Sequence, residues 1–168
     1  FILMGCLVTV FNYISYHLLE APFQLSQSWI GLISIAYLAG IYSSSKAAQW
    51  SFKYGRAKVL PLMLLMMMAG LLITLIPALW AILLGLIIFA FAFFAAHSTA
   101  SSWVSVQAIQ YRAVAASLYL FCYYIGSSLL GSSGGLIWEN FGWIGINLSV
   151  VLVLAVGLFL TFYLHDTK

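Results

Sequence analysis

The sequence predicts an all-α, multi-pass membrane protein with six transmembrane helices, arranged as two inverted repeats of three helices. The composition is the first reason, because only 5% of the 168 residues are charged and 65% are hydrophobic. An ordinary soluble domain has about 25% charged residues, so this chain lacks the polar shell of a water-soluble fold. Its six Lys and Arg residues are too few to follow nucleic-acid phosphates. We therefore expect the lipid bilayer as a partner and no nucleic acid.

The second reason is the spacing of the charges, which leaves long uncharged runs. Crossing the hydrocarbon core takes about 20 helical residues, and four of the runs fit one helix each. The run at 59–111 would be about 80 Å long as a single helix. It must therefore turn back once, and Pro77 with the following Trp80 marks that turn. The predicted spans, which together form one domain, are 1–18, 29–49, 59–76, 79–102, 114–137 and 144–164.

The third reason is the side on which the basic residues fall. They lie at or after the ends of the second, fourth and sixth spans, whereas the opposite loops hold Glu20 and Glu139. Cytoplasmic loops carry the excess of Lys and Arg, so we expect both ends of this chain in the cytoplasm. The basic residues are Lys46, Lys53, Arg56, Lys58, Arg112 and Lys168.

The spans repeat a pattern of composition. The first and fourth hold large polar groups, the second and fifth are rich in Gly and Ser, and the third and sixth are almost wholly aliphatic. Two successive three-span units must be inverted, as in the halves of secondary transporters. We expect the aliphatic spans to face lipid. In the fifth span, Gly126, Gly131 and Gly135 are expected to let another helix pack closely.

His97 is a candidate contact for a substrate, because ionisable groups at membrane depth usually face a cavity or a partner. An unperturbed histidine titrates near pH ~6.5 and can exchange protons near neutrality. Ser98 and Ser101 follow on the same span. The alternative is a neutral His97 that is hydrogen-bonded to Ser101, one turn further on.

Tyrosines supply the other candidates. Asn12 and Tyr16 are one turn apart and lie beside Tyr13, so this face either binds substrate or bonds to a neighbouring helix. Tyr119 and Tyr123 are also one turn apart, and they either contact an amphiphilic substrate or pack within the bundle.

Other functions find little support in the sequence. No Asp or Glu lies inside a predicted span, and no residue set suited to catalysis, phosphate binding or metal ligation occurs. We therefore expect no enzyme activity, no cofactor and no metal site. Four tryptophans near span ends are expected to be interfacial anchors. They are Trp29, Trp80, Trp138 and Trp143.

Short motifs along the whole chain resemble those of a known family. They lie at 11–13, 22–26, 54–56, 93–98 and 117–128, together with Gly31 and Gly40. The chain resembles the C-terminal six-helix half of a major facilitator superfamily transporter, in the drug:proton antiporter and arabinose-efflux-permease-like branch.

The resemblance implies proton-coupled efflux of a small-molecule substrate by alternating access in the bacterial inner membrane. It also implies a partner, the N-terminal six-helix half of the same transporter, which we expect to be missing from this chain. The proton-coupling carboxylate is then expected in that half. The alternative is a non-transporting six-span scaffold or assembly subunit.

One cytoplasmic loop motif matches the family only in part. Lys53, Gly55 and Arg56 match its final residues, but Phe52 stands at the position of its Asp and Ala48 at the position of its first Gly. The charged latch that the resemblance implies for this loop cannot form here in the usual way.

Overall fold

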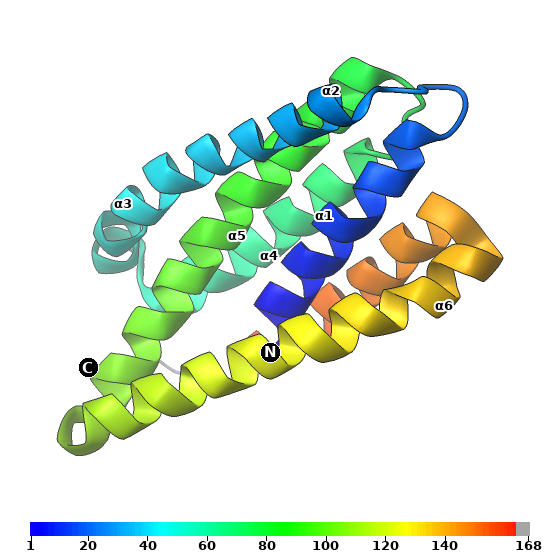
Figure 1. The fold of residues 1–168 in the computed structure, drawn as a ribbon. Coiled ribbons are helices and arrows are strands. Elements are labelled where there is room, and N and C mark those ends of the chain that lie inside the picture. Colours follow the sequence, from blue (N-terminus) through cyan, green and yellow to red (C-terminus); the bar gives the residue numbers. More distant parts are fainter. Residues whose placement is uncertain (164–168) are drawn as a thin grey trace.

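The computed structural model describes residues 1–163, and every regular element in that range is a helix, so the all-α prediction is confirmed there. The helices form an elongated bundle (Figure 1). Lys168 and residue 164 of the predicted sixth span lie outside the described residues. The elements are α1 (Ile2–Leu19), α2 (Gln27–Leu32), the 3₁₀ turn η1 (Ile33–Ala36), α3 (Tyr37–Tyr54), α4 (Arg56–Ile73), α5 (Leu79–Gln107), the 3₁₀ turn η2 (Ile109–Tyr111) and α6 (Arg112–Thr161).

Within this range, four helical stretches are long and apolar enough to cross a membrane. They contain α1, α4, α5 and α6. The α3 helix is not among them, because serines at 43–45 together with Lys46 and Lys53 make it more polar. The predicted fifth and sixth spans are both part of α6. The count of six crossings therefore stays a prediction.

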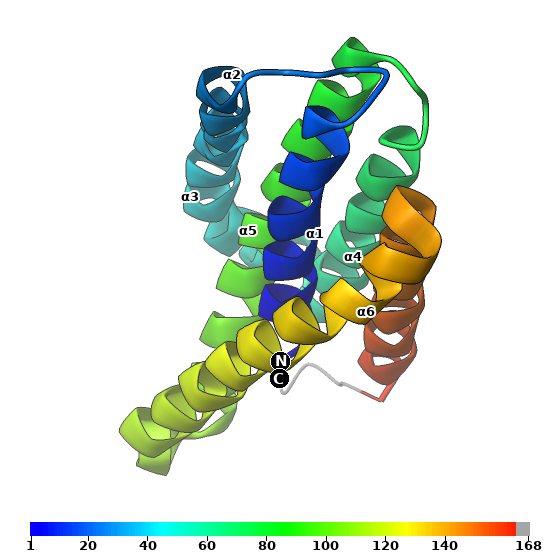
Figure 2. The same cartoon turned by 45° about the vertical axis from the view of Figure 1, so that its right-hand side comes forward.

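The α6 helix reverses its direction at Gly142. There the backbone adopts φ 57° and ψ −149°, a combination that is open to glycine because it has no Cβ. Figures 1 and 2 show the helix doubling back at this point. We call residues 112–141 the first limb of α6 and residues 143–161 its second limb. The break lies between the two runs that the sequence predicts as separate spans.

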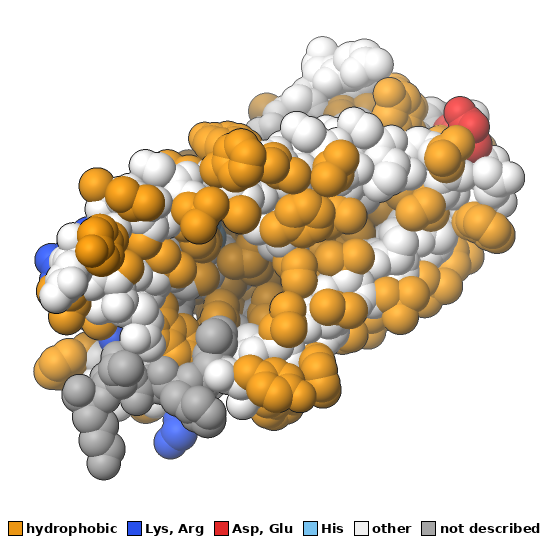
Figure 3. All heavy atoms as spheres, turned by 90° about the horizontal axis from the view of Figure 1, so that it is seen from below, with side chains coloured by type: hydrophobic (Ala, Val, Ile, Leu, Met, Phe, Trp, Pro, Cys, Tyr) orange, Lys and Arg blue, Asp and Glu red, His pale blue; other side chains and the backbone are white. Residues whose placement is uncertain are grey.

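The basic and acidic turns lie at opposite ends of the bundle. The α3–α4 turn and the α5–α6 turn are at one end (Figure 1), and they hold Lys53, Arg56, Lys58 and Arg112. Figure 3 shows Lys and Arg side chains toward one end, Asp or Glu side chains at the other, and mostly hydrophobic side chains between them. This separation of charge is what the sequence predicts, whereas the membrane face that each end meets stays a prediction.

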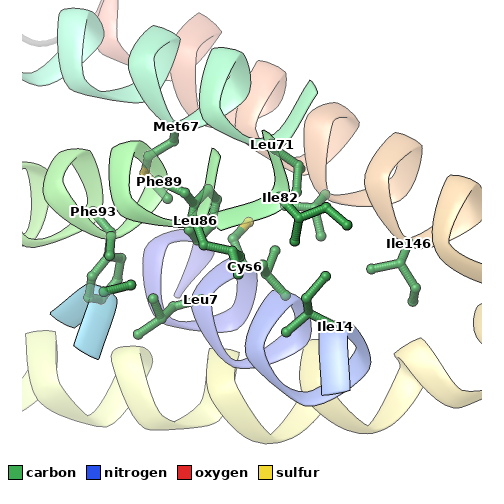
Figure 4. Packing of buried hydrophobic residues seen from close by; sticks show 14 of the residues in the cluster. Cys6, Leu7, Ile14, Met67, Leu71, Ile82, Leu86, Phe89, Phe93 and Ile146 are labelled. Carbon is green, nitrogen blue, oxygen red and sulfur yellow. The ribbon is translucent and has the colours of Figure 1, made fainter. Parts of the chain in front are cut away.

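The core forms where α1, α4, α5 and the second limb of α6 converge. Figure 4 shows Phe89 and Phe93 of α5, Met67 of α4, Ile14 of α1 and Ile146 of the second limb pointing into this region, and all five are fully or almost fully buried. Because lipid tails are as apolar as these side chains, the packing stabilises the bundle through van der Waals contact rather than through removal of water.

The α4 helix packs closely against α5, although its side chains are hydrophobic on every face. A Cβ atom added to Gly70 would lie 2.7 Å from the carbonyl oxygen of Gly85, and one added to Gly85 would lie 2.7 Å from Cγ2 of Thr74. Leu62, Leu65 and other side chains on the opposite face of α4 are exposed. The prediction that this helix faces lipid therefore fits only the exposed face of α4, because the other face packs against α5.

We expect Gly85→Ala to destabilise the protein, because the added methyl group meets the backbone of α4 and overpacking costs about 1–3 kcal/mol. A lower thermal unfolding temperature of the full-length protein in detergent would show this. Gly31→Ala is the matched control, since a Cβ there meets no atom within 4 Å. Equal unfolding temperatures for the two variants would contradict the close approach of α4 and α5.

The small residues of α3 pack against α5. Gly40, Ser43, Ala47 and Ser51 recur every three to four residues and are buried. The Ser43 hydroxyl donates to the carbonyl oxygen of Phe91 at 2.7 Å, and the hydroxyls of Ser51 and Thr99 are 3.3 Å apart. The small-residue pattern of the predicted second span thus forms a helix–helix contact.

Candidate functional site

Two polar cavities adjoin the first limb of α6, one toward each end of the bundle. The first, which we call the His97 cavity, lies between α5 and the start of this limb and measures about 390 Å³. It brings together four of the predicted candidates from distant parts of the sequence. Its walls are His97, Ser98, Ser101, Ser102, Ser105, Ala116, Tyr119 and Leu120.

His97 is held by aromatic neighbours on both helices. Its Nδ1 and the hydroxyl of Tyr119 are joined by a hydrogen bond of 2.8 Å. The Tyr123 ring lies 4.7 Å from the imidazole, and the Phe93 ring stacks on it at 6.0 Å with an angle of 5° between the planes. The bond to Tyr119 occupies Nδ1, which leaves Nε2 as the ring nitrogen for a further partner.

The alternative bond from His97 to Ser101 is not the one observed. The His97 side chain reaches across to α6, whereas the Ser101 hydroxyl donates to the carbonyl oxygen of Ser98 at 3.2 Å. Ser102 and Ser105 likewise donate to carbonyls of their own helix, at 2.9 and 3.0 Å. Their hydroxyl oxygens keep lone pairs that can accept hydrogen bonds. The cavity therefore suits a ligand that carries hydrogen-bond donors.

The second cavity, which we call the Tyr16 cavity, measures about 660 Å³ and lies between α1 and the end of the first limb. Three rings meet there: Tyr13, Tyr16 and Trp138 have centroids 5.9–6.1 Å apart. Glu139 supplies a carboxylate to the wall. The walls are Phe11, Asn12, Tyr13, Ser15, Tyr16, Leu19, Gln27, Gly135, Trp138 and Glu139.

The α1 face lines a cavity and also bonds to a neighbouring helix, whereas substrate binding there stays a prediction. Asn12 and Tyr16 are exposed in the cavity wall. Tyr13 also bonds to a neighbouring helix, since its hydroxyl donates to the carbonyl oxygen of Gly131 at 3.2 Å. The same ring lies directly over Gly134. Tyr13 therefore attaches α1 to the first limb of α6 at the edge of the cavity.

Glycines on the first limb make this close contact possible. A Cβ on Gly126 would meet the backbone of Phe1, and one on Gly131 would lie 2.9 Å from Cγ1 of Val8. Gly135 is less crowded, because its nearest neighbour is the Tyr13 hydroxyl at 3.5 Å. The closer contact with the Tyr13 ring is made by Gly134, a residue that the spacing of small residues does not indicate.

Trp143 is not an interfacial anchor, so that prediction is wrong. The side chain is buried, and its Nε1 donates to the carbonyl oxygen of Thr74 at 3.2 Å. Thr74 follows the end of α4, where helix carbonyls lack partners within the helix. Asn147 is also fully buried and donates to the Trp143 carbonyl at 3.3 Å. Trp143 therefore links α6 to the end of α4, whereas Trp29 and Trp80 are exposed.

The loop motif forms the turn between α3 and α4. Gly55 has φ 85° and ends one helix as the next begins, which is a conformation that favours glycine. The Lys53 ammonium lies 5.0 Å from the centre of the Tyr54 ring, and Phe52 is almost completely exposed. The motif thus shapes a basic turn, and none of its residues lies in the walls of either polar cavity.

Sequence reasoning missed several residues of the two cavities. Trp138, Glu139 and Gln27 line the Tyr16 cavity, and they lie near the ends of helices, where their composition indicates interface or loop. Ser102 and Ser105 line the His97 cavity. The signal for these serines was present, because positions 98, 101, 102 and 105 share one helix face.

An apolar helical bundle with charged turns at its ends and polar cavities along one helix defines a multi-pass membrane protein. The chain is similar to bacterial transporters over nearly its whole length. It is 47% identical over 161 residues to an uncharacterized transporter of Buchnera aphidicola subsp. Schizaphis graminum. It is 42% identical over 164 residues to the uncharacterized MFS-type transporter YybF of Bacillus subtilis, and 46% identical over 165 residues to the inner membrane transport protein YnfM of Escherichia coli.

These matches cover 96–98% of this chain but 39–41% of the relatives. The chain therefore spans about two-fifths of the length of the curated relatives that it matches. No protein-family model matches it. All three relatives are named as transporters or transport proteins.

Proposed function

We propose that this chain is the C-terminal six-helix half of a major facilitator superfamily transporter, which exports a small molecule from bacteria in exchange for protons. The observation that carries this proposal is the pair of polar cavities along the first limb of α6, in a bundle that is otherwise apolar. The similarity to transporters over nearly the whole chain supports transport, whereas export and proton exchange are parts of the proposal that it does not address.

The six crossings would be α1, the rod formed by α2, η1 and α3, then α4, α5 and the two limbs of α6. The first three and the last three would be the inverted repeats. The basic turns at Gly55 and at residues 108–112 would face the cytoplasm, following the excess of Lys and Arg there. Both cavities would then lie on the path between the two sides of the membrane.

A second half would complete this path. Secondary transporters bind their substrates at the interface between repeats, near the middle of the membrane. The first limb of α6 is exposed along much of its length, for example at Phe121 and Tyr124, and it borders both cavities. We therefore assign this limb to the interface with the N-terminal half, where substrate would bind.

Proton coupling would then depend on both halves. Within the described helices, Glu139 is the one carboxylate, and it lies near the bend at Gly142 rather than in mid-span. An acid that exchanges protons in the centre of the membrane would come from the N-terminal half. His97 is the ionisable side chain that this chain would contribute to the path.

The topology can be tested by fusing alkaline phosphatase after single positions of the full-length protein, because the enzyme is active only outside the cytoplasm. We expect high activity after Gln24 and Pro77 and low activity after Gly55 and Gln110. Equal activity after Gln24 and Gly55 would mean that the α2–α3 rod does not cross the membrane. The proposed count of six crossings would then be wrong.

Transport itself can be tested with everted membrane vesicles that contain the full-length protein. A pH-sensitive dye reports the proton gradient, and a panel of small molecules with hydrogen-bond donors is added one at a time. We expect at least one compound to dissipate the gradient, and vesicles without the protein to show no response. A protein that responds to no compound and purifies within a fixed multi-subunit assembly would favour the scaffold alternative.

A further inference from the structure

A cluster of positive charge surrounds the α3–α4 turn, and the described residues supply no acidic partner for it. Lys53, Arg56 and Lys58 lie within six residues, and no carboxylate forms an ion pair with them in the described part of the chain. Glu20 and Glu139 are in the loop and bend regions at the other end of the bundle. Among residues 1–163, no acidic side chain offsets this charge, so the turn is suited to an anion from its surroundings.

An apolar groove begins at this turn. It lies between α3, α4 and α5, measures about 420 Å³ and has almost wholly apolar walls. It is separate from both polar cavities, with which it shares no residue. We call it the α3–α4 groove, and its walls are Trp50, Tyr54, Lys58, Val59, Leu62, Met63 and Phe91.

The groove has a polar mouth and an apolar interior. Tyr54 and Lys58 are exposed at the turn, and Lys53 lies over the Tyr54 ring. The Phe91 ring lies 5.9 Å from that of Trp50 and belongs to the apolar interior. Trp and Tyr are enriched at the level of the lipid head groups, and the stem of a Lys side chain can lie along apolar surface while its ammonium group reaches that level.

We propose that the α3–α4 groove binds an anionic phospholipid, with an acyl chain along Val59, Leu62 and Met63 and the phosphate near Lys58 and Tyr54. Charge complementarity favours this occupant, because an anionic lipid brings net negative charge to the basic turn, whereas a zwitterionic lipid adds a cation beside its phosphate. Basic pockets between transmembrane helices bind acidic head groups in this way. The site depends on the position of the turn at the membrane surface and is independent of the transported substrate.

The test uses the full-length protein purified in a neutral detergent. Binding of dioleoyl phosphatidylglycerol, dioleoyl phosphatidylcholine and inorganic phosphate is compared by native mass spectrometry and by the shift in unfolding temperature. We expect phosphatidylglycerol to bind most tightly. Lys58→Gln should weaken its binding about fivefold, which is the factor for one Lys beside an anionic membrane surface.

Two matched pairs of variants locate the site. Leu62→Trp fills the groove and should abolish the preference for phosphatidylglycerol, whereas Leu72→Trp changes an exposed leucine further along α4 and should leave it intact. Arg112→Gln removes one positive charge from the other basic turn and should have little effect. Equal binding of the two lipids, an equal effect of Lys58→Gln and Arg112→Gln, or unchanged binding by Leu62→Trp would overturn the proposal.

Discussion

Gly142→Ala is expected to destabilise the full-length protein by about 1–3 kcal/mol, the cost of a residue held in a sparsely populated backbone region. At φ 57° and ψ −149°, the carbonyl groups next to the residue crowd any Cβ atom. The reversal of α6 also positions Trp143 for its bond to Thr74 and Asn147 for its contact with Trp143. A shift of the bend would therefore disturb the contact between α6 and α4 as well.

The unfolding temperature in detergent measures this effect, and Gly142→Asn is an informative second variant. Asparagine tolerates the left-handed helical region at ψ near ~50°, but the ψ of Gly142 lies far outside it. We expect Asn to fail as Ala does, and Gly31→Ala to leave stability unchanged. If Gly142→Asn were as stable as the unchanged protein while Gly142→Ala was not, residue 142 would adopt the left-handed helical conformation. That result would contradict the φ of 57° and ψ of −149° at this bend.

The all-α class could be predicted because charge and hydropathy patterns indicate long apolar helices directly. The turn near Pro77 separates α4 from α5, although α4 already ends at Ile73, where Thr74 and Leu75 close the helix with bonds to residues three positions back. The break near residue 142 lies between two runs of predicted span. The polarity of α3 is explained in part by its packing, since the hydroxyls of Ser43 and Ser51 contact α5.

Contacts between helices could not be predicted with the same success. Lipid and protein core are equally apolar. The sequence of a uniformly hydrophobic helix such as α4 therefore does not distinguish its buried face from its exposed face. The approach of Gly70 to Gly85 and of Gly134 to Tyr13 depends on which helices become neighbours. That choice is determined by the whole bundle and is invisible in the spacing of one segment.

The candidate site was predicted residue by residue but not as a cavity. His97, Ser98, Ser101 and Tyr119 were separate candidates, and the structure brings them into one wall. The bond from His97 to Ser101 was a reasonable alternative from helix spacing, yet the imidazole turns toward Tyr119. A partner on another helix cannot be found from spacing along α5, which is why the Tyr119 pairing appears only in three dimensions.

Tyr119→Phe is expected to lower the transport efficiency of the full-length protein about tenfold, a factor that corresponds to a hydrogen bond of about 1.4 kcal/mol. The substitution keeps the ring that packs beside Tyr123 and removes the hydroxyl that orients His97. The imidazole then loses the bond that fixes its orientation at the cavity wall. His97→Ala removes both the bond and the ring that stacks on Phe93, so we expect a larger loss and a changed dependence of transport on pH.

Initial rates in everted vesicles, measured over a range of pH at matched protein levels, distinguish this role from simple packing. Tyr163→Phe is the matched control, because that tyrosine is exposed near the end of the second limb and lies outside both polar cavities. Equal unfolding temperatures for all variants, together with reduced transport in Tyr119→Phe and His97→Ala alone, would place the pair on the substrate path. Unchanged transport and unchanged pH dependence in His97→Ala would instead restrict the His97–Tyr119 bond to holding α5 against α6.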